Sequence, residues 1–510
     1  MAKTIMVQGT SSHVGKSILC TALCRIFAQD GYSTAPFKAQ NMALNSAVTP
    51  DGGEIGRAQG VQAEAAGIKP TVFMNPILLK PKQDMQSQVV VLGKPLGDMS
   101  AREYQNEYVP KAESLVKECI TRLKSEYEVL VIEGAGSPAE VNLRDRDIVN
   151  MKTAELAEAP VLLAADIDRG GALAALIGTL ELLEPDEKER IKGFIINKFR
   201  GDIELLRPGL DFLERKTGLP VLGVVPYLYD HGIDEEDSVC LTEINSRGDV
   251  DQAIQIAVVH LPQMSNFTDF NPLMNLPDTR FRYVNRGQNI GSADIIIIPG
   301  TKNTILDLNY LREQGYDQEI ISLAERGAYV VGICGGYQML GQELLDPLGT
   351  EAGIGGQKGL GLLPGITTYY AEKETHQIRA TILSGNGFWE ELHGKTVTGY
   401  EIHMGSTVIE PAGRDLLQID VRSGRKVKIG DGATNSSGKV WGTHIHGLFD
   451  NPSLLLAFIN NVRQEKGLAR LEYDNLDICT RERNYDRLAD TVREALDMPR
   501  IYQIMNLKSV

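Results

Sequence analysis

The stretch GTSSHVGKS at residues 9–17 has the residue types of a phosphate-binding loop. Such a loop surrounds phosphates with backbone N–H groups at the N-terminus of a helix, where the helix dipole favours an anion. A lysine then reaches the β- and γ-phosphates, and a serine hydroxyl binds Mg²⁺. The first glycine stands one residue earlier than in the common spacing. We expect ATP to be held by Gly9, Thr10, Val14, Gly15, Lys16 and Ser17, with Ser17 also a ligand of Mg²⁺.

Polar residues end two other apolar runs. VLVIEG (129–134) carries Glu133 near its end, and GFIINK (193–198) ends in Asn197 and Lys198. An acid at the carboxyl end of a strand in a nucleotide-binding sheet can organise Mg²⁺. Taken alone, Glu133 is equally compatible with a solvated acid, but beside the phosphate loop we expect a Mg²⁺ ligand. The spacing GTxxxVGKS resembles the loop of dethiobiotin synthetase-like ATPases, and this resemblance implies that Asn197 and Lys198 bind the adenine of ATP.

Cys334 has the setting of a nucleophile. The apolar run GAYVVGI leads directly into Cys334, and Gly335, Gly336 and a stretch of helical character follow. A cysteine on a sharp strand-to-helix turn is exposed to substrate, and the helix N-terminus favours its thiolate. The N–H of Gly335 and a second N–H at Gly300 are the expected oxyanion donors. The alternative is a buried core cysteine before a glycine-rich turn.

A base for this cysteine should be a downstream histidine. The downstream histidines are His376, His393, His403, His444 and His446. The segment GTHIHGLF (442–449) resembles the last motif of class I triad glutamine amidotransferases, which implies that His446 is the base and His444 is structural. Many such enzymes have a Glu two residues after this histidine, but here the position is Leu448. The third member of the triad is therefore not predicted.

Two sets of apolar runs alternate with helical segments and must position these residues. Near-continuous apolar strands separated by helices indicate parallel sheets covered on both faces. The predicted fold class is therefore α/β, with two doubly wound, mostly parallel-sheet domains (P-loop NTPase-like and class I glutamine amidotransferase-like) and a C-terminal helical segment. The expected strands are 4–9, 129–134, 160–166, 193–198 and 221–226, then 254–262, 293–300, 327–334 and 439–449.

An acidic stretch separates the two sets. We expect an ATP-binding synthase domain at 1–230, a linker at 231–251 and an amidotransferase domain at 252–450. Residues 451–510 are expected to form a helical extension of the amidotransferase domain. Its last helix has Leu488, Val492, Leu496 and Ile501 at helical spacing and is predicted to pack on that domain.

Composition narrows the class of protein. The 510 residues carry a formal net charge of −15, which argues against general nucleic-acid or membrane-surface binding. The 6 cysteines form no CxxC pair, as expected in a reducing compartment. The sequence has no signal-peptide pattern, and no apolar run approaches the roughly 18 residues of a membrane span. We therefore expect a cytoplasmic protein.

Long motifs extend the resemblance over the whole chain. They include PFKAQNMALNS (36–46), EGAGSPAEVNLRDRDIVNM (133–151), LPQMSNFTDFNPL (261–273) and GYEIHMG (399–405). Together with the two motifs above, they resemble the cobyric acid synthase family. The resemblance implies amidation of the b, d, e and g carboxylates of adenosylcobyrinic acid a,c-diamide. ATP would activate each carboxylate as an acyl phosphate, and L-glutamine would supply ammonia through a thioester on Cys334.

Two alternatives stay open at this point. One is a related ligase resembling cobyrinic acid a,c-diamide synthase. The other is a switch resembling the ParA and MinD ATPases, in which the second domain only binds partners and hydrolyses no glutamine. The sequence does not predict the oligomeric state.

Substrate contacts are expected at two edges of the first sheet. One group follows the second strand, where a doubly wound sheet opens its crevice, and consists of Lys38, Gln40, Asn41, Asn45 and Arg57. The other follows Glu133 and includes Arg144, Asp145, Arg146 and Asp147. We predict a catalytic role for Asp147, against the alternative of a structural ion pair. Asp166 and Asp168, after the next strand, are further candidates.

Overall fold

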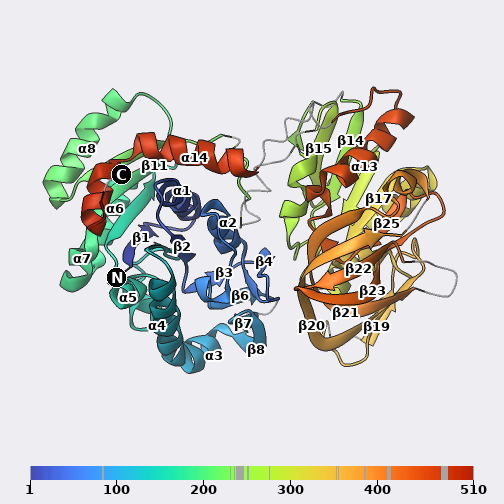
Figure 1. Cartoon of the computed structure of the whole chain (residues 1–510), viewed down its shortest axis with the longest axis horizontal. Helices are drawn as coiled ribbons and strands as arrows, with labels where there is room; N and C mark the ends of the chain where they lie inside the picture. Colours follow the sequence, from blue (N-terminus) through green and yellow to red (C-terminus); the bar gives the residue numbers. More distant parts are fainter. Residues whose placement is uncertain are drawn as a thin grey trace. The chain divides into compact units, whose positions relative to one another are not determined.

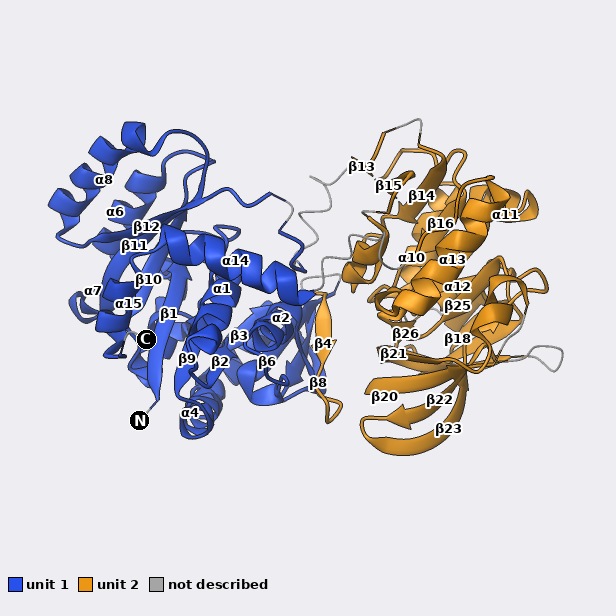
Figure 2. Ribbon diagram, turned by 45° about the horizontal axis from the view of Figure 1, so that its top comes forward, with its two compact units in different colours: residues 1–43, 54–234, 479–510 blue, residues 44–53, 235–478 orange. Residues whose placement is uncertain are grey.

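A computed structural model describes residues 2–508 except 83–85, 230, 235, 237–245, 250–251, 275, 352, 354, 384–385, 410–414 and 473–480. The chain forms two compact units, coloured separately in Figure 2. Unit 1 comprises residues 1–43, 54–234 and 479–510, and unit 2 comprises residues 44–53 and 235–478. No helix in the described ranges is long and apolar enough to cross a membrane.

Unit 1 is built on a six-stranded parallel sheet. Its strand order is β12-β11-β10-β1-β9-β2. The strands are β1 (Lys3–Gly9), β2 (Thr34–Phe37), β9 (Val129–Glu133), β10 (Val161–Asp166), β11 (Ile191–Phe199) and β12 (Val221–Pro226). The central strands are buried along their length, because each faces helices on both sides. The predicted parallel α/β fold is confirmed.

Helices and a smaller sheet complete unit 1 (Figure 1). The main helices are α1 (Lys16–Gln29), α2 (Arg57–Ala65), α4 (Val109–Glu126), α5 (Met151–Ala157), α6 (Ala172–Leu182), α7 (Pro185–Arg190), α8 (Ile203–Thr217), α14 (Arg481–Ala495) and α15 (Met498–Met505). The smaller sheet contains β3 (Gln40–Met42), β6 (Ile77–Pro81), β7 (Gln86–Val91) and β8 (Lys94–Ser100).

Unit 2 has a sheet that is parallel at its centre, with short antiparallel strands at both edges. Its order is β13-β15-β14-β16-β17-β25-β24. The strands are β13 (Ser246–Arg247), β14 (Ile254–Val259), β15 (Thr279–Val284), β16 (Ile295–Ile298), β17 (Tyr329–Ile333), β24 (Ala433–Thr434) and β25 (Val440–Thr443). The helices are α10 (Thr304–Glu313), α11 (Tyr316–Glu325), α12 (Gly335–Leu340) and α13 (Pro452–Glu465).

A second, mostly antiparallel sheet of unit 2 was not predicted. It contains β18 (Glu343–Asp346), β19 (Gly355–Lys358), β20 (Gly365–Ile382), β21 (Thr396–Ile409), β22 (Leu417–Arg422), β23 (Arg425–Asp431) and β26 (Ile445–His446). The run predicted as one strand at 439–449 is divided between the sheets, because β25 pairs with β17 and β26 pairs with β21. The histidine motif therefore lies where the chain passes from one sheet to the other.

The prediction that the C-terminal helices extend the amidotransferase domain is wrong for the helices after α13. Helices α14 and α15 belong to unit 1, where α14 lies along α1 (Figures 1 and 2). The apolar residues at helical spacing, including Leu488 and Ile501, pack into the core around α1. Arg25 pairs with Asp486 at 2.8 Å, which fixes the same contact at the surface. Helical spacing reveals an apolar face but not the surface that covers it.

The predicted first domain also contains a segment of unit 2. Residues 44–53, which include β4 (Ser46–Val48), belong to unit 2. Val48 packs with Tyr400 and Ile402, and the Gln377 side chain donates to the Val48 carbonyl at 2.6 Å. Residues 235, 237–245, 250 and 251 of the predicted linker lie outside the described residues.

Candidate active sites

The phosphate loop connects the end of β1 to the start of α1. Gly15 has φ 93°, a left-handed conformation that glycine adopts at no steric cost, and it forms the N-cap of α1. Lys16 is buried and donates to the carbonyls of Ser11 at 2.9 Å and Gly136 at 3.1 Å. The predicted ATP-binding residues run from the last residue of β1, through the loop, to the first residues of α1, at the carboxyl edge of the sheet. They are Gly9, Thr10, Val14, Gly15, Lys16 and Ser17.

Glu133 is the centre of a buried polar cluster at this edge. Its carboxylate accepts hydrogen bonds from Ser17 Oγ at 2.9 Å, Lys38 Nζ at 2.8 Å and Gln62 Nε2 at 2.6 Å. Burial alone would raise the pKa of Glu133, but the charge and hydrogen bond of Lys38 and the bonds from Gln62 and Ser17 hold it below the ordinary value. A hydroxyl beside an ionised carboxylate is a donor set that Mg²⁺ accepts, so the residues fit this ion.

Gln59 and Gln62 also belong to the cluster, although neither was predicted from the sequence. They lie one turn apart on α2, and Gln59 Nε2 is 3.5 Å from Glu133. Their spacing in EIGRAQGVQ (54–62) could have indicated this, because glutamines at i and i+3 lie on one face of a helix.

Asn197 and Lys198 contact the phosphate loop from the end of β11. Asn197 Nδ2 donates to the Val14 carbonyl at 2.8 Å, and Lys198 Nζ donates to the His13 carbonyl at 2.7 Å. Lys198 also pairs with Asp166 at 3.0 Å. The structure therefore brings this pair to the phosphate loop, and a role in binding adenine stays a prediction.

The expected substrate residues fall into different environments. Asn41 Nδ2 donates to Gln59 Oε1 at 2.9 Å, which joins it to the Glu133 cluster. Gln40 accepts a bond from the Tyr104 hydroxyl. Arg57 is half-buried in an ion pair with Asp234. Asn45 is part of unit 2 and donates to the Glu236 carbonyl at 3.1 Å.

Asp147 has a structural role in this fold. Its carboxylate accepts from the backbone N–H groups of Val149 and Asn150 at 2.9 Å and of Met151 at 2.8 Å, at the start of α5. Arg144 pairs with Glu184 on the surface. Arg146 is exposed. None of these contacts involves the Glu133 cluster, so a catalytic role for Asp147 stays a prediction.

Cys334 lies on a strained turn between β17 and α12. Its backbone has φ 52° and ψ −110°, and its side chain is buried. A Cβ on Gly336 would overlap the Ile298 carbonyl oxygen, so only glycine fits there. The Cys334 thiol lies 3.5 Å from the Ile402 carbonyl, the acceptor of its hydrogen bond. A Cβ on Gly300 would lie 3.6 Å from Cys334 Cβ, so Gly300 adjoins Cys334, and Gly335 follows it directly in the chain.

The third member of the triad is Asp269. His446 is buried, and both its ring and the Cβ of Cys334 lie close to Gly300. Its Nδ1 is 2.6 Å from Asp269 Oδ2, and Asp269 Oδ1 accepts from the Gly447 N–H at 3.0 Å. Burial alone would lower the pKa of His446, but the charge and hydrogen bond of Asp269, and then the bond with Cys334, raise it to about 10. Leu448, at the usual glutamate position, is a core residue.

Asp269 comes from a 3₁₀ helix, η4 (Phe267–Leu273), far from the histidine in the chain. The motif LPQMSNFTDFNPL contains it, but nothing in the spacing connects it to His446. The one sequence feature that could have indicated Asp269 is that this acid lies in the motif at 261–273, to which no other role was assigned.

His444 forms a separate pair. Its Nδ1 is 2.7 Å from Asp431 Oδ1, and its Nε2 is 3.2 Å from Thr407 Oγ1. His403 stacks on it with ring centroids 4.2 Å apart. These contacts fix the backbone between β25 and β26, where the chain passes from one sheet to the other. They are consistent with the structural role expected for His444.

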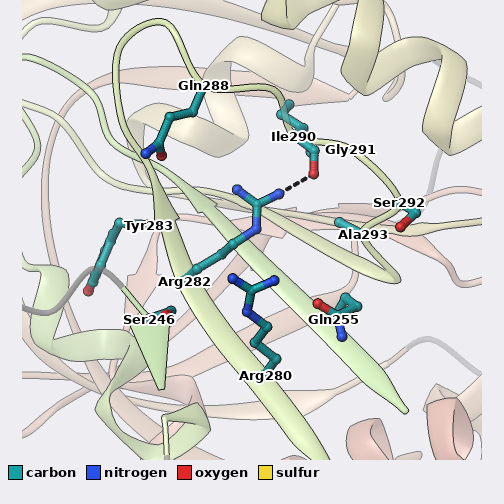
Figure 3. Close-up of a pocket in the computed structure, with 10 residues that line it drawn as sticks. All are labelled: Ser246, Gln255, Arg280, Arg282, Tyr283, Gln288, Ile290, Gly291, Ser292 and Ala293. Atoms are coloured by element: carbon teal, nitrogen blue, oxygen red, sulfur yellow. Dashed lines mark hydrogen bonds between the residues drawn. The ribbon is translucent and has the colours of Figure 1, made fainter. Parts of the chain in front are cut away.

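A hollow of about 400 Å³ lies elsewhere on unit 2, beside β15 (Figure 3). Arg280 and Arg282 line it, and Arg282 donates to the Ile290 carbonyl. Burial, and then the charge of Arg280, lower the pKa of Arg282. Its lining residues include no predicted residue of either site, so this hollow is separate from the chemistry above.

Both halves match known families. Residues 5–236 match the CobQ/CobB/MinD/ParA nucleotide binding domain, and residues 255–454 match the CobB/CobQ-like glutamine amidotransferase domain. The nucleotide-binding and amidotransferase halves expected from the sequence are thus confirmed. The match of the second half to an amidotransferase domain argues against the alternative of an ATPase switch whose second domain only binds partners.

Curated relatives match over the full chain. A cobyric acid synthase of Desulforamulus reducens is 60% identical over 99% of this chain and 99% of its own length. Cobyric acid synthases of Moorella thermoacetica and Pelotomaculum thermopropionicum are 52% and 53% identical, over 100% and 99% of this chain and 98% and 97% of their own lengths.

Proposed function

The chain belongs to the cobyric acid synthase family, and we propose that it amidates the b, d, e and g carboxylates of adenosylcobyrinic acid a,c-diamide with ATP and L-glutamine. It is a glutamine-dependent amide ligase with a nucleotide-binding domain. The observation that carries the proposal is the presence, in one chain, of a Cys334–His446–Asp269 triad and a phosphate loop beside Glu133. Hydrolysis of glutamine yields ammonia, and a nucleotide site can activate the carboxylate that accepts it.

The triad supports glutamine hydrolysis through a thioester. Because Asp269 occupies Nδ1 of His446, Nε2 is the nitrogen available to the thiol of Cys334. The sulfur attacks the side-chain carboxamide carbon of glutamine, and His446 passes the thiol proton to the departing ammonia. Water then attacks the thioester, and His446 transfers a proton from this water to the sulfur, which releases glutamate. The raised pKa of His446 favours the thiolate–imidazolium pair that begins the cycle.

The oxyanion of each tetrahedral intermediate needs two donors. The N–H of Gly335 opens helix α12, where the helix dipole adds to the N–H. Gly300 adjoins both catalytic side chains, since a Cβ there would lie 3.0 Å from His446 Cε1 and 3.6 Å from Cys334 Cβ. This closeness supports the assignment of Gly300 as the second donor.

Unit 1 supports activation of the carboxylate. The turn at 9–15 and the N-terminus of α1 would hold the phosphates, and Lys16 would neutralise their charge. Mg²⁺ would be held by Ser17 and Glu133 and would stabilise negative charge on the phosphates. A corrinoid carboxylate oxygen attacks the γ-phosphorus and ADP leaves. Ammonia then attacks the acyl carbon, and inorganic phosphate and a proton leave, so that one amide forms per ATP and glutamine.

Lys38 and Asn41 are the expected substrate residues that lie closest to this chemistry. Lys38 pairs with Glu133, and Asn41 joins the same cluster through Gln59. A positive group beside Glu133 supports the binding of an anionic carboxylate near this cluster. Arg57 pairs with Asp234 instead of Glu133.

The test is a comparison of nitrogen donors on the purified full chain. With the a,c-diamide and ATP, mass spectra should show four added amides from either glutamine or ammonium. Cys334→Ala should abolish the reaction with glutamine and keep the reaction with ammonium, whereas Lys16→Ala should abolish both. Amidation of cobyrinic acid in place of the a,c-diamide, or glutamine-dependent turnover in Cys334→Ala, would overturn the proposal.

A further inference from the structure

The hollow beside β15 has two arginines on one face of the strand. Side chains alternate between the faces of a strand, so Phe281 lies in the core while Arg280 and Arg282 share the opposite face. Figure 3 shows their guanidinium groups on the same side of β15, at the hollow of about 400 Å³. Two cations held this close repel each other, so an anion bound between them would stabilise both.

The neighbouring strands add neutral polar side chains to this face. Ser246 on β13 pairs with Arg282, and Gln255 on β14 pairs with Arg280. Paired residues of adjacent strands point to the same face of a sheet, and both side chains line the hollow. The hollow is therefore polar across three strands, although the other face of β15 belongs to the core.

Arg282 is held in place by the opposite wall of the hollow. Its Nη2 donates to the Asn289 carbonyl at 3.3 Å and to the Ile290 carbonyl. The wall is fixed in turn, because the N–H groups of Ile290 and Gly291 donate to the Glu319 carboxylate at 3.1 and 2.7 Å. Both bonds of Arg282 use one nitrogen, so the rest of its guanidinium can donate to a ligand. A cation that is fixed in advance loses little entropy on binding.

Arg280 carries a charge that its surroundings do not cancel. Within the described ranges, no hydrogen bond or ion pair involves its guanidinium, and its Nε is buried. Burial is the main cause that lowers the pKa of Arg282, and the charge of Arg280 is the next, although Glu319 acts in the opposite direction. Asp and Glu outnumber Lys and Arg by 67 to 52 in this chain, so a shortage of carboxylates does not explain the arrangement. A bound acceptor would satisfy the buried donor.

We propose that Arg280 and Arg282 form a binding site for a phosphate group, separate from both candidate active sites and independent of the proposed function. A guanidinium presents parallel N–H donors that match the oxygens of a phosphate. Two guanidinium groups also match the charge of about −1.5 to −2 that a phosphate monoester carries at pH 7, whereas a carboxylate carries a single charge.

The size of the hollow bears on what carries the phosphate. Its volume of about 400 Å³ lies in the range of about 300–1,000 Å³ that is usual for small-molecule sites. Ile290 and Ala293 add apolar surface to the polar lining. The hollow therefore has room for a small phosphate monoester as well as for inorganic phosphate.

The test is equilibrium binding of inorganic phosphate and of glycerol 3-phosphate to the full chain, at constant ionic strength. The phosphate loop of unit 1 also attracts these anions, so Lys16→Ala is measured beside the wild type. We expect one class of sites that persists in Lys16→Ala and whose Kd rises about tenfold or more in Arg280→Ala, because charge-assisted hydrogen bonds are lost. Arg280→Lys keeps the charge without the planar fork and should bind with intermediate affinity.

Arg286→Ala is the matched control. Arg286 is exposed and is not among the residues that line the hollow, so its removal changes the net charge equally and should leave the Kd unchanged. Arg280→Ala loses no described hydrogen bond or ion pair of the side chain, so its free energy of unfolding without phosphate should not fall below that of the wild type. Added phosphate should raise the Tm of the wild type and of Lys16→Ala more than that of Arg280→Ala.

The two probes identify the ligand, and three results would overturn the proposal. Tighter binding of glycerol 3-phosphate would favour a monoester, and equal affinities would favour inorganic phosphate. The proposal fails if Arg280→Ala binds both probes as the wild type does, or if Arg286→Ala loses as much affinity, which would show general attraction of anions. It also fails if succinate binds as tightly as phosphate and with the same dependence on Arg280, because the site would then be one for carboxylates.

Discussion

Replacement of Asp269 is the most direct test of the glutaminase, because its carboxylate is hydrogen-bonded to His446. The histidine motif at 442–449 does not contain this residue, so the structure alone assigns it to the site. Asp269→Asn keeps the size of the group and removes its charge. The asparagine can still accept a hydrogen bond through its oxygen, but it can also present its amide to Nδ1 and favour the wrong tautomer. The change therefore acts on the charge and orientation of the base and leaves the packing of η4 in place.

The magnitude follows from the pKa of His446. A rise from the ordinary 6.5 to about 10 corresponds to about 5 kcal/mol of preference for the imidazolium, at about 1.4 kcal/mol per pH unit. Without the Asp269 charge, burial still lowers the pKa of His446 and only the interaction with Cys334 raises it, so the pKa falls from about 10. We expect kcat/KM for glutamine to fall about 10²- to 10⁴-fold, the scale of losing the third member of a triad.

The assay is glutamate release as a function of pH. The wild-type rate should decline only as the pH rises through about 10, where the imidazolium loses its proton. In Asp269→Asn this alkaline limb should move to lower pH. Asp431→Asn is the matched control, because Asp431 bonds the buried His444 in the same way, at 2.7 Å. It should keep the alkaline limb of the wild type.

The orienting role of Asp269 would be refuted if Asp269→Asn kept the wild-type rate and pH profile. It would also be refuted if Asp431→Asn and Asp269→Asn shifted the profile equally, because the effect would then follow the loss of any buried carboxylate. Unchanged amidation with ammonium in Asp269→Asn shows that the fold is intact.

Four other outcomes are expected. Glu133→Gln leaves Lys38 buried without its counter-charge and should lower ammonium-supported amidation at least about 100-fold, while glutamine hydrolysis without ATP is unchanged in a glutamate assay. Gly336→Ala forces a Cβ onto the Ile298 carbonyl and should lower the free energy of unfolding by about 1–3 kcal/mol or more in denaturant titrations. Leu488→Ala should destabilise unit 1 by about 2–5 kcal/mol in the same titration, and no effect would contradict the packing of α14 on α1. Because folding raises the pKa of His446, its contribution to stability should be complete below pH 6.5 and lost as the pH rises through about 10, a dependence that Asp269→Asn should abolish.

The local motifs were predictable because their residues are neighbours in the chain. The phosphate loop and the cysteine turn each need a strand, a few backbone-permissive residues and a helix, and the sequence shows all three at 4–29 and 327–340. The parallel strands were predictable for the same reason, since burial on both faces leaves a continuous apolar run.

Long-range contacts were not predictable in this way. Asp269 reaches His446 across 177 residues, and its hydrogen bond depends on how η4 packs beside β26. The long strands β20 and β21 alternate apolar and polar residues only in part and were not recognised as a sheet. The C-terminal helices were assigned to the nearer domain in sequence, although their apolar face is complementary to α1.

Assigning α14 and α15 to unit 1 has a consequence for biosynthesis of the chain. The core around α1 requires Leu488, Val492 and Ile501, which the ribosome adds after every residue of unit 2. Domains generally fold as units while they emerge, N-terminal first, but here the first-made unit must wait for the last residues. Unit 2 is therefore synthesised in full before the residues that complete the core around α1, and a chain truncated after α13 would leave the apolar face of α1 uncovered by α14 and α15.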